Sequence, residues 1–493
     1  EIRCRNVPYF FYDSSDFGNF SAWFFVYFDS TTGAAYSTEV YIMKKLLALA
    51  LALLLVGCAA RSEKYLVSGA LYPEMAPCPQ PRDYIRPSGM HDNDAYDRVH
   101  EPWLADRNRQ RNQPEGYAQA PQAYLADVIA SFFDRSDETN PPYNRVLAPV
   151  NTYIALAMLA EVTGGETRDE ILSAAHIDRP DTLRDNAHAV WMANYCDDGA
   201  LKSIPASSLW LSDTLRYREE AIAALSENYF ASVYQGRMGD PDYDRALRDW
   251  IDTQTGGLLR ESSKNVYLDP LTAFSLVTTS AYQAHWTAKF SPSATENGIF
   301  RGVEGDVECA YMKQSGDRSY YWSDRFAAIG LSLRGSGTMW LLLPDEGVDA
   351  SSLLADGDGT AFLLCGGENT PDKRVIVHLS LPKFDISCDG TLDASWQSLG
   401  IQRVFGASAD FSPMLSDGNA GFPEPITLGK VQHAARVAID EDGVTAAAFT
   451  FGPVVGAVEP PDEEVDFVLD RPFVFGITSH DGLPLFVGVV DRP

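Results

Sequence analysis

The chain closes on Arg471-Pro472-Phe473-Val474-Phe475-Gly476-Ile477, followed by Leu485-Phe486-Val487-Gly488-Val489-Val490. Both runs are rich in β-branched and aromatic residues and are bounded by turn formers, a composition typical of strands. His480-Asp481-Gly482 lies between them and predicts the turn of a hairpin. The sequence therefore predicts that the chain ends on a pair of adjacent strands, at residues 473–478 and 485–490.

The preceding residues divide into a helical part and a strand-rich part. Apolar residues at helical spacing predict helices over 123–133 and 151–161. Thr167 and Glu170 have the spacing of a capping box and predict the start of another helix, and helices are expected to continue to about Trp250. Helices first and strands later indicate an α+β fold rather than a parallel α/β sheet. The predicted strands are 274–282, 327–333, 339–343, 375–381, 434–439 and 465–469.

Composition excludes some classes of function. The 493 residues are 45% hydrophobic and 22% charged, as in an ordinary globular protein, and carry a formal net charge of −29. Phosphate binding needs a Lys/Arg surface, so this charge argues against a nucleic-acid partner. The sequence contains no G-x-S-x-G, H-E-x-x-H, P-loop or dinucleotide motif, and therefore gives little support for an enzyme or for a cofactor.

The segment from Met43 to Cys58 has the pattern of a secretory signal. A basic start, an apolar run over 46–56 and a small residue at Gly57 follow one another. The run is shorter than the roughly 20 residues that a bilayer-spanning helix needs. Leu55-Val56-Gly57-Cys58 resembles the lipobox of bacterial lipoproteins, which implies cleavage before Cys58 and lipidation of its sulfur. The alternative is a plain signal peptide that contains a cysteine.

This interpretation sets the expected domain organisation. Residues 1–42 contain no methionine and are interpreted as upstream sequence translated from a misplaced start, and residues 43–57 as the signal peptide. Residues 58–120 are polar and contain seven prolines, which predicts a tether between a lipidated Cys58 and a folded domain over 121–493. A small subdomain is the alternative for the tether. The resulting localisation is extracytoplasmic, on a membrane at the bacterial cell surface.

The cysteines have no metal-binding pattern. They stand at 4, 58, 78, 196, 309, 365 and 388, without a C-x-x-C pair or a cluster with histidine at zinc-like spacing. No metal site is therefore expected. Without Cys4 and Cys58 an odd number remains, so most are expected to be buried as small hydrophobic residues, with one disulfide left open.

Six segments, in order along the chain, resemble the serpin family of serine-protease inhibitors. The resemblance covers about residues 121–493 and implies the serpin fold, in which helices pack on a large, mainly antiparallel sheet with two smaller sheets and an exposed reactive loop. It also implies a monomer. The segments are Ala148–Asn151 with Ala155–Leu159, Gly165–Thr167, Thr279–Tyr282 with Trp286, Val431–Ala434 with Asp440–Gly443, and the two C-terminal strands.

The resemblance assigns Asn151, Thr278 and His433 to the shutter, where the large sheet opens, and Trp286 to the breach, beside the start of the loop. The family's shutter usually has two serines, an asparagine and a histidine. Here Ala148 and Asn151 stand at the serine positions and Thr278 at the asparagine position. Our hypothesis is that Asn151 and Thr278 have exchanged roles, so that one amide and one hydroxyl still face His433.

The loop itself has a composition that physical chemistry explains. Gly443-Val444-Thr445-Ala446-Ala447-Ala448 is small, uncharged and β-compatible. Such a segment can become a central strand, because it brings no unpaired charge whose burial would cost several kcal/mol. The resemblance makes this stretch, with Glu441 before it, the hinge of a loop that inserts into the sheet after cleavage. The three alanines fit the inhibitory members of the family.

The expected partner is a serine endopeptidase. At the family's usual spacing from Gly443 the cleaved bond is Ala457–Val458 to within one or two residues, with Val455 as the alternative. No Lys or Arg occurs from Gly443 to Asp470, so a protease whose primary pocket carries an aspartate has nothing to bind. Small apolar residues suit an elastase-like enzyme, and subtilisin-like enzymes come next. The resemblance implies a covalent acyl-enzyme complex and no catalytic residues in this chain.

One alternative function is a non-inhibitory serpin that acts as a cell-surface binding or structural module. Phe449, a bulky residue close to the hinge, is the sequence feature that favours it.

Overall fold

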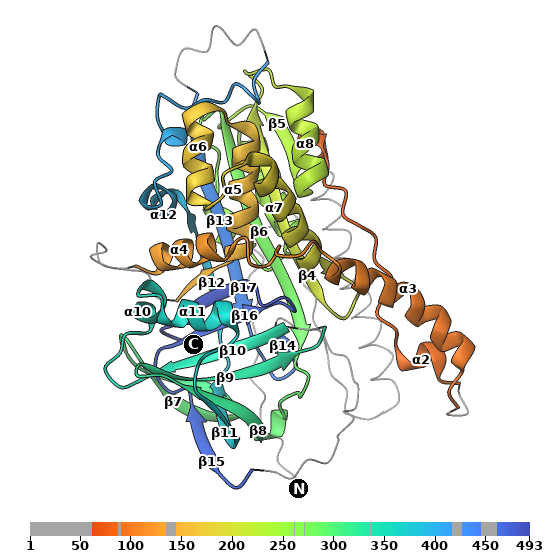
Figure 1. The fold of residues 1–493 in the computed structure, drawn as a ribbon, viewed down its shortest axis with the longest axis vertical. Coiled ribbons are helices and arrows are strands. Elements are labelled where there is room, and N and C mark those ends of the chain that lie inside the picture. Colours follow the sequence, from red (N-terminus) through yellow and green to blue (C-terminus); the bar gives the residue numbers. More distant parts are fainter. Residues whose placement is uncertain are drawn as a thin grey trace, which may run out of the picture. The chain divides into compact units, whose positions relative to one another are not determined.

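Two β-sheets with helices packed on them make up the described part of the protein (Figure 1). The structure is a computed structural model, and it describes residues 62–86, 90–134, 144–260, 262–270, 272–335, 337–416, 426–444 and 461–493. Gly57–Pro493 forms one compact unit, and Glu1–Val56 belongs to a separate unit. The predictions for residues 1–42, 43–57 and Cys58 therefore fall outside the described residues.

The elements agree with the helices-then-strands order in outline. The helices are α2 (Pro81–Tyr84), α3 (Asn93–Arg111), α4 (Gln122–Phe133), α5 (Pro149–Val162), α6 (Gly165–Ala174), α7 (Pro180–Asn194), α8 (Glu219–Tyr229), α9 (Pro241–Gln254), α10 (Ala350–Ala355), α11 (Asp358–Cys365) and α12 (Asp393–Ser398). The strands are β1 (Leu66–Ser68), β2 (Arg145–Leu147), β3 (Cys196–Asp197), β4 (Lys202–Ser212), β5 (Ser232–Gly236), β6 (Phe274–His285), β7 (Glu296–Gly302), β8 (Gly305–Trp322), β9 (Phe326–Leu333), β10 (Gly337–Pro344), β11 (Asp372–Pro382), β12 (Asp385–Thr391), β13 (Leu428–Ala438), β14 (Gly443–Val444), β15 (Glu464–Val468), β16 (Phe473–Thr478) and β17 (Pro484–Val490).

The first sheet has the strand order β1-β5-β4-β6-β13-β12 within the described residues. β4 and β6 are antiparallel along their length, whereas β6 and β13 run parallel. Helices α5 and α7 cover one face of this sheet, in front of β4 and β6 (Figure 1). Helix α5 is buried almost all round because it is apolar on every side. This packing places Asn151 of α5 beside the middle of β6.

The second sheet has the order β15-β11-β8-β9-β10-β16-β17-β2 within the described residues. The predicted C-terminal hairpin is confirmed, with Phe473 opposite Val490 and both strands buried. The long strand β8 pairs with β7, β11 and β9. The two smaller sheets that we expected are therefore joined into a single sheet. The predicted fold class, helices with several mixed sheets, is confirmed.

Two local predictions are wrong, and the structure gives the physical reason. Residues 202–212 and 232–236, expected to be helical, are β4 and β5. β4 is buried on both faces between its neighbours, so its sequence lacks the alternation that identifies a strand.

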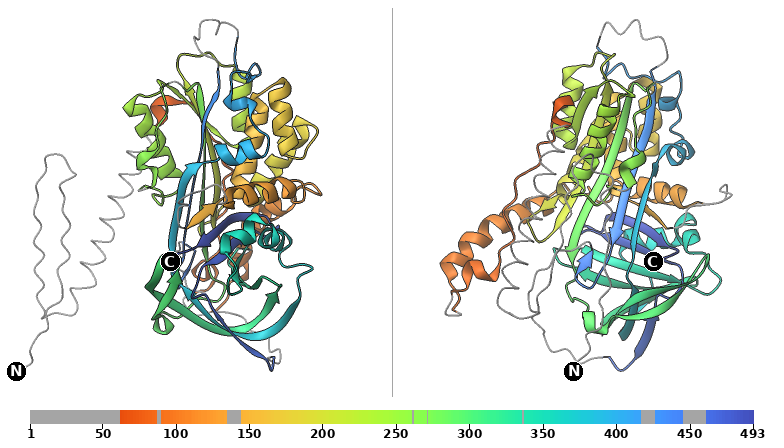
Figure 2. Two further views of the ribbon diagram at one scale, coloured as in Figure 1. Left: turned by 90° about the vertical axis from the view of Figure 1, so that its left-hand side faces the viewer. Right: turned by 180° about the vertical axis from the view of Figure 1, so that it is seen from behind.

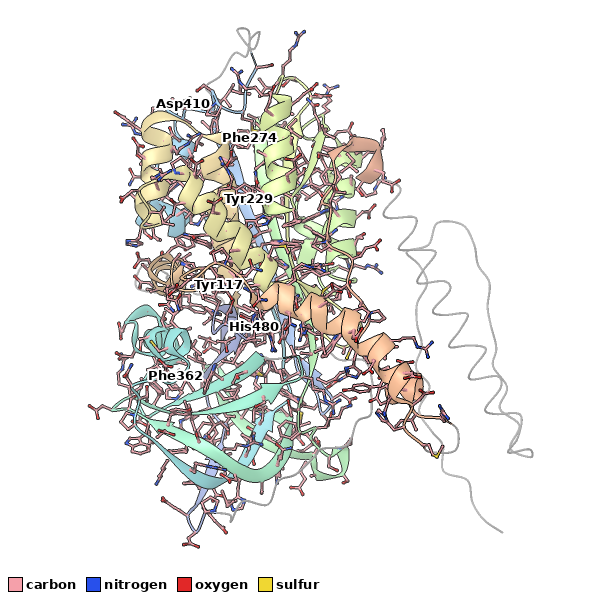
Figure 3. The ribbon with its side chains drawn as sticks, turned by 45° about the vertical axis from the view of Figure 1, so that its right-hand side comes forward. Tyr117, Tyr229, Phe274, Phe362, Asp410 and His480 are labelled. Carbon is pink, nitrogen blue, oxygen red and sulfur yellow. The ribbon has the colours of Figure 1, made fainter. Side chains whose placement is uncertain are left out.

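The predicted capping box is the second error. Gly164, not Thr167, is the N-cap of α6. The Thr167 hydroxyl instead accepts a hydrogen bond from Asp410 N, and the Glu170 carboxylate accepts from Gln402 N and Arg403 N. Figure 3 shows Asp410 next to α6. Both side chains therefore hold a distant loop rather than their own helix.

Residues 62–120 lie on the folded domain, so the prediction of a tether is corrected for their described part. β1 pairs with β5 at the edge of the first sheet. The ring of Tyr72 packs at a tilt against Trp191 of α7, and the Trp103 indole of α3 donates to Asp198. The Tyr117 hydroxyl donates to Asp481, beside His480 (Figure 3). These contacts come from single aromatic side chains in a polar, proline-containing segment, and such contacts leave no periodic signal in the sequence.

The view from behind shows the same segment running from β5 towards α2 and α3 (Figure 2, right). None of the helices in the described part of the chain combines the length and the apolar character of a bilayer span. The five cysteines of the described residues are free thiols, and only Cys196 is buried while Cys365 is exposed. The expectation that most cysteines are buried is therefore wrong.

Candidate functional site

The candidate site is the place where strands β6 and β13 part. Their parallel pairing ends at Ala434, opposite Thr279. Further along, β6 pairs with the short strand β14 instead, with Gly443 opposite His285 and Val444 opposite Ala284. We call the residues between these points the open segment: Ser280–Gln283 of β6 and Ala435–Val437 of β13. It lies in the interior of the first sheet, between two strands that are each paired on their other side.

Val444 marks the end of the open segment. It pairs with Ala284 of β6 on one side and forms a bridge with Ile439, just after β13, on the other. Val444 therefore occupies the position of a middle strand, and it is only 1% exposed. The open segment can take a further strand in the same direction, because strands on both sides present backbone donors and acceptors to it.

Hydrogen bonds to its backbone carbonyls hold the turn Asp440–Gly443 that leads into β14. The Trp286 indole donates to Asp440 O at 2.8 Å, and Trp286 N donates to Asp442 O at 3.1 Å. Phe290 N donates to Glu441 O at 3.1 Å. Trp286 is buried and lies edge-on to Phe290. The predicted breach residue thus anchors the start of the loop directly.

Charged side chains fix the same turn. Glu441 accepts from Lys383 Nζ at 2.8 Å and from the Thr295 hydroxyl at 2.8 Å. The hydrogen bond from Lys383 is the main reason that the pKa of Glu441 lies below its usual value. Lys289 Nζ pairs with Asp442 at 2.5 Å. These cations had no signal in the sequence, because their role depends on which strands the fold brings together.

Gly443 is required by close approach. A Cβ atom built there would lie 2.1 Å from Ala284 O and 2.7 Å from His285 Cα. Both are backbone atoms of β6, and His285 O accepts a hydrogen bond from Arg334 N at 2.8 Å, so this part of the strand cannot move aside without disturbing that bond.

We expect Gly443→Ala to expel β14 from its place between β6 and Ile439. The clash should lower the free energy of unfolding by about 1–3 kcal/mol and speed cleavage of the adjacent chain by a non-specific protease. Thermal unfolding and limited proteolysis measure the two effects. Gly390→Ala in β12, where a Cβ meets nothing within 4 Å, is the matched control. Equal behaviour of the two variants would contradict the close-packing argument.

The shutter histidine lies at the point where the pairing ends. His433 Nε2 accepts a hydrogen bond from Ala148 N at 3.1 Å, so the ring proton is on Nδ1 and faces the Thr278 hydroxyl at 3.3 Å. The Asn151 amide donates to Thr279 O at 2.7 Å rather than to His433. The hypothesis of exchanged roles is therefore corrected: the hydroxyl faces His433, but a backbone N–H takes the other ring nitrogen.

Burial keeps His433 neutral. Desolvation lowers the pKa of its imidazole from 6.5 to about 4. A protonated ring would also lose the hydrogen bond from Ala148, because both ring nitrogens would then be donors. The shutter therefore depends on the neutral form.

This depressed pKa predicts acid sensitivity. The unfolded chain binds a proton at His433 below about pH 6.5, whereas the folded chain binds it only near pH 4, so stability falls as the pH drops through this window. At pH 4.5 the loss from His433 should be about 2–3 kcal/mol relative to pH 7.5. Denaturant unfolding of the wild type and of His433→Gln at both pH values measures it. Wild-type and variant curves with the same pH dependence would refute the assignment.

Part of the predicted site falls outside the described residues. Two groups flank the open segment, as described above: at one end the shutter residues Asn151, Thr278 and His433, and at the other Trp286 with Glu441, Gly443 and Val444. The hinge residues Thr445, Ala446, Ala447 and Ala448 and the reactive-bond residues Ala457 and Val458 are not among the residues described. The described residues contain no group of three or more His, Cys, Asp or Glu placed to hold a metal ion.

Comparisons with known proteins agree with this geometry. The family model described as "Serpin (serine protease inhibitor)" matches residues 124–493. The leukocyte elastase inhibitor of Sus scrofa is 29% identical over 377 residues, which cover 73% of this chain and 96% of the relative.

Solved structures show the same fold. The native state of tengpin, a thermophilic serpin, has a TM-score of 0.67 at 20% identity and covers 78% of this chain and 95% of its own. Thyroxine-binding globulin in complex with thyroxine has a TM-score of 0.64 at 22% identity, covering 76% of this chain and 99% of its own.

Proposed function

The chain belongs to the serpin family, and from this we propose that it is a suicide-substrate inhibitor of serine endopeptidases, most readily of the elastase type. The observation that carries the proposal is the position of β14. Its two residues already occupy the place of a middle strand at one end of the open segment. The residues that follow Val444 need only continue in the same direction to lie between β6 and β13.

The proposed mechanism uses the protease's own chemistry. The protease serine attacks the carbonyl of Ala457 and forms an acyl-enzyme. Cleavage frees the loop, which enters the open segment behind Val444 and carries the attached protease along the sheet. Distortion of the protease then stops deacylation. This chain contributes no catalytic residue, and its part is to hold the loop outside the sheet until the bond is cut.

The loop sequence supports the target class. The absence of Lys and Arg from Gly443 to Asp470 disfavours trypsin-like enzymes, and Ala457 and Val458 suit a small apolar pocket. The similarity to a leukocyte elastase inhibitor points in the same direction. Subtilisin-like enzymes are the second class to be tested.

Incubation with elastase tests the proposal on a denaturing gel. We expect a covalent complex with the mass of both proteins, and mass spectrometry should place the cut between Val455 and Glu459. Simple cleavage without a complex would instead favour a non-inhibitory serpin, for which Phe449 is the sequence argument. Thyroxine-binding globulin, whose structure has the same fold, is seen bound to a small molecule.

We also propose that Cys58 is lipidated and holds the inhibitor on the bacterial cell surface, on the basis of Leu55-Val56-Gly57-Cys58. Two or three acyl chains suffice for stable attachment, where one does not. Expression of the chain from Met43 in a bacterium with radiolabelled palmitate should label the wild type but not Cys58→Ser, and should move that variant from the membrane to the soluble fraction. Equal labelling of both proteins would refute the assignment.

A further inference from the structure

A small cavity lies beside the residues that anchor the loop. It has a volume of about 120 Å³ and lies between the segment after β6 and strands β8 and β9. Trp286 and Phe290 form part of its wall, and Leu331 adds a further buried apolar surface. Thr287, Ala288 and Ser332 are exposed and line its mouth. The cavity is therefore open to solvent at one end and apolar at the other.

Arg318 of β8 lines this cavity, and none of the described carboxylates pairs with it. Its guanidinium donates to the side-chain oxygen of Gln314, and its Nε is buried without a hydrogen-bond partner in the described structure. The neighbouring carboxylate, Asp317, pairs with Arg374 instead. Burial lowers the pKa of Arg318, and no acidic group offsets this effect. Arg318 thus keeps a charge in a largely desolvated place at a cost.

The rest of the cavity's polar lining does not compensate the charge. Gln314 offers its amide oxygen to Arg318 and donates from its nitrogen to Ala288 O and Lys289 O. Lys289 itself pairs with Asp442 outside the lining. The cavity therefore presents one positive charge, a planar donor group and an apolar wall.

We propose that this cavity is a binding site for a short-chain carboxylate. A guanidinium donates two parallel hydrogen bonds to a carboxylate, and one cation matches one negative charge better than it matches a phosphate or sulfate. The aliphatic part of the ligand packs against Trp286, Phe290 and Leu331. The volume is well above the least that admits a single water molecule, which leaves room for a molecule of two to four carbon atoms.

The site is placed to act on the loop. Trp286 and Phe290, which the ligand contacts, are the residues that donate hydrogen bonds to Asp440, Asp442 and Glu441. A ligand in the cavity holds both aromatic rings in their present positions and so stabilises the turn that leads into β14. This consequence rests on the proposed function: the bound carboxylate keeps β14 in the place from which insertion continues and so lowers the fraction of inhibitor that is cleaved without trapping protease.

Calorimetric titration of the purified protein with sodium butyrate tests the site, in a buffer free of other carboxylates. We expect saturable binding in the millimolar range. Butyramide, which has the same shape but no charge, should bind at least tenfold more weakly, and sodium chloride should compete little. Arg318→Met should abolish binding of butyrate, and Arg318→Lys should weaken it about tenfold because the planar pair of donors is lost.

Arg301→Met serves as the control, since Arg301 is exposed on the neighbouring strand β7 and pairs with Asp470. Unlike Arg301→Met, Arg318→Met should leave the melting temperature equal to or above that of the wild type, because it removes a desolvated charge. Equal butyrate binding by the wild type and Arg318→Met, or equal affinity for butyrate and butyramide, would overturn the proposal. If the wild type does not bind butyrate but still forms a normal complex with elastase, the carboxylate site alone is rejected. If it binds butyrate but forms no complex with elastase, the inhibitory function alone is rejected.

Discussion

Val444→Arg is expected to convert the inhibitor into a substrate of elastase. Val444 is 1% exposed and lies between Ala284 and Ile439 at the end of the open segment. An arginine there cannot keep this position without burying an unpaired charge, which costs several kcal/mol. The first step of insertion would then become unfavourable, while the cleavable bond, more than ten residues away in the sequence, stays unchanged. Deacylation would overtake insertion.

Gel analysis after mixing with elastase measures the outcome. The variant should yield cleaved protein and active protease, with covalent complex reduced at least tenfold relative to the wild type. Val468→Arg, on the exposed side of β15, carries the same change in charge and should inhibit normally. Wild-type yield of complex from Val444→Arg would show that insertion does not depend on the place of Val444 between β6 and Ile439.

Cutting the loop between Val455 and Glu459 should make the protein much more stable. Insertion would provide partners for the backbone groups of β6 and β13 that face the open segment. About seven new backbone hydrogen bonds at roughly 0.5–1.5 kcal/mol each give a gain of about 4–10 kcal/mol. The melting temperature should rise by on the order of 10 °C. Differential scanning calorimetry before and after limited elastase digestion measures it.

The same digestion of Val444→Arg provides the control. Its loop is cut as in the wild type, but the introduced arginine would keep the loop from entering the sheet. The new hydrogen bonds would not form, so the melting temperature of this variant should stay nearly constant. A wild-type melting temperature that does not rise on cutting would mean that the intact protein stores no energy in its excluded loop. The trapping mechanism would then lack its driving force.

Several features of the fold could be predicted from the sequence because they depend on local chemistry. The strands at 473–478 and 485–490 are continuous β-branched and aromatic runs, and the structure pairs them as expected. Helices at 123–133 and 151–161 follow from apolar spacing and appear as α4 and α5. Strand β4 was missed because a strand buried on both faces has no alternation to detect.

The candidate site likewise contains residues that the sequence indicated and contacts that only the structure shows. Resemblance to a known family indicated Glu441, Gly443, Val444, Trp286 and His433, and the structure places the first four at one end of the open segment and His433 at the other. It could not indicate that Asn151 would donate to Thr279 O, or that Lys383 would hold Glu441, since these contacts depend on the relative positions of separate elements.

The sequence by itself determined that residues 443–448 can become a strand, because small and uncharged side chains tolerate burial whatever surrounds them. It also determined that a trypsin-like protease has no basic residue to bind, since that depends only on side-chain type. Tertiary structure alone decided that β6 and β13 part beyond Thr279, that the described residues between 62 and 120 pack on the domain, and that Arg318 faces a cavity without a carboxylate among the described residues. Pairing, docking and charge compensation are relations between residues far apart in the chain, and the fold establishes them only when those residues meet.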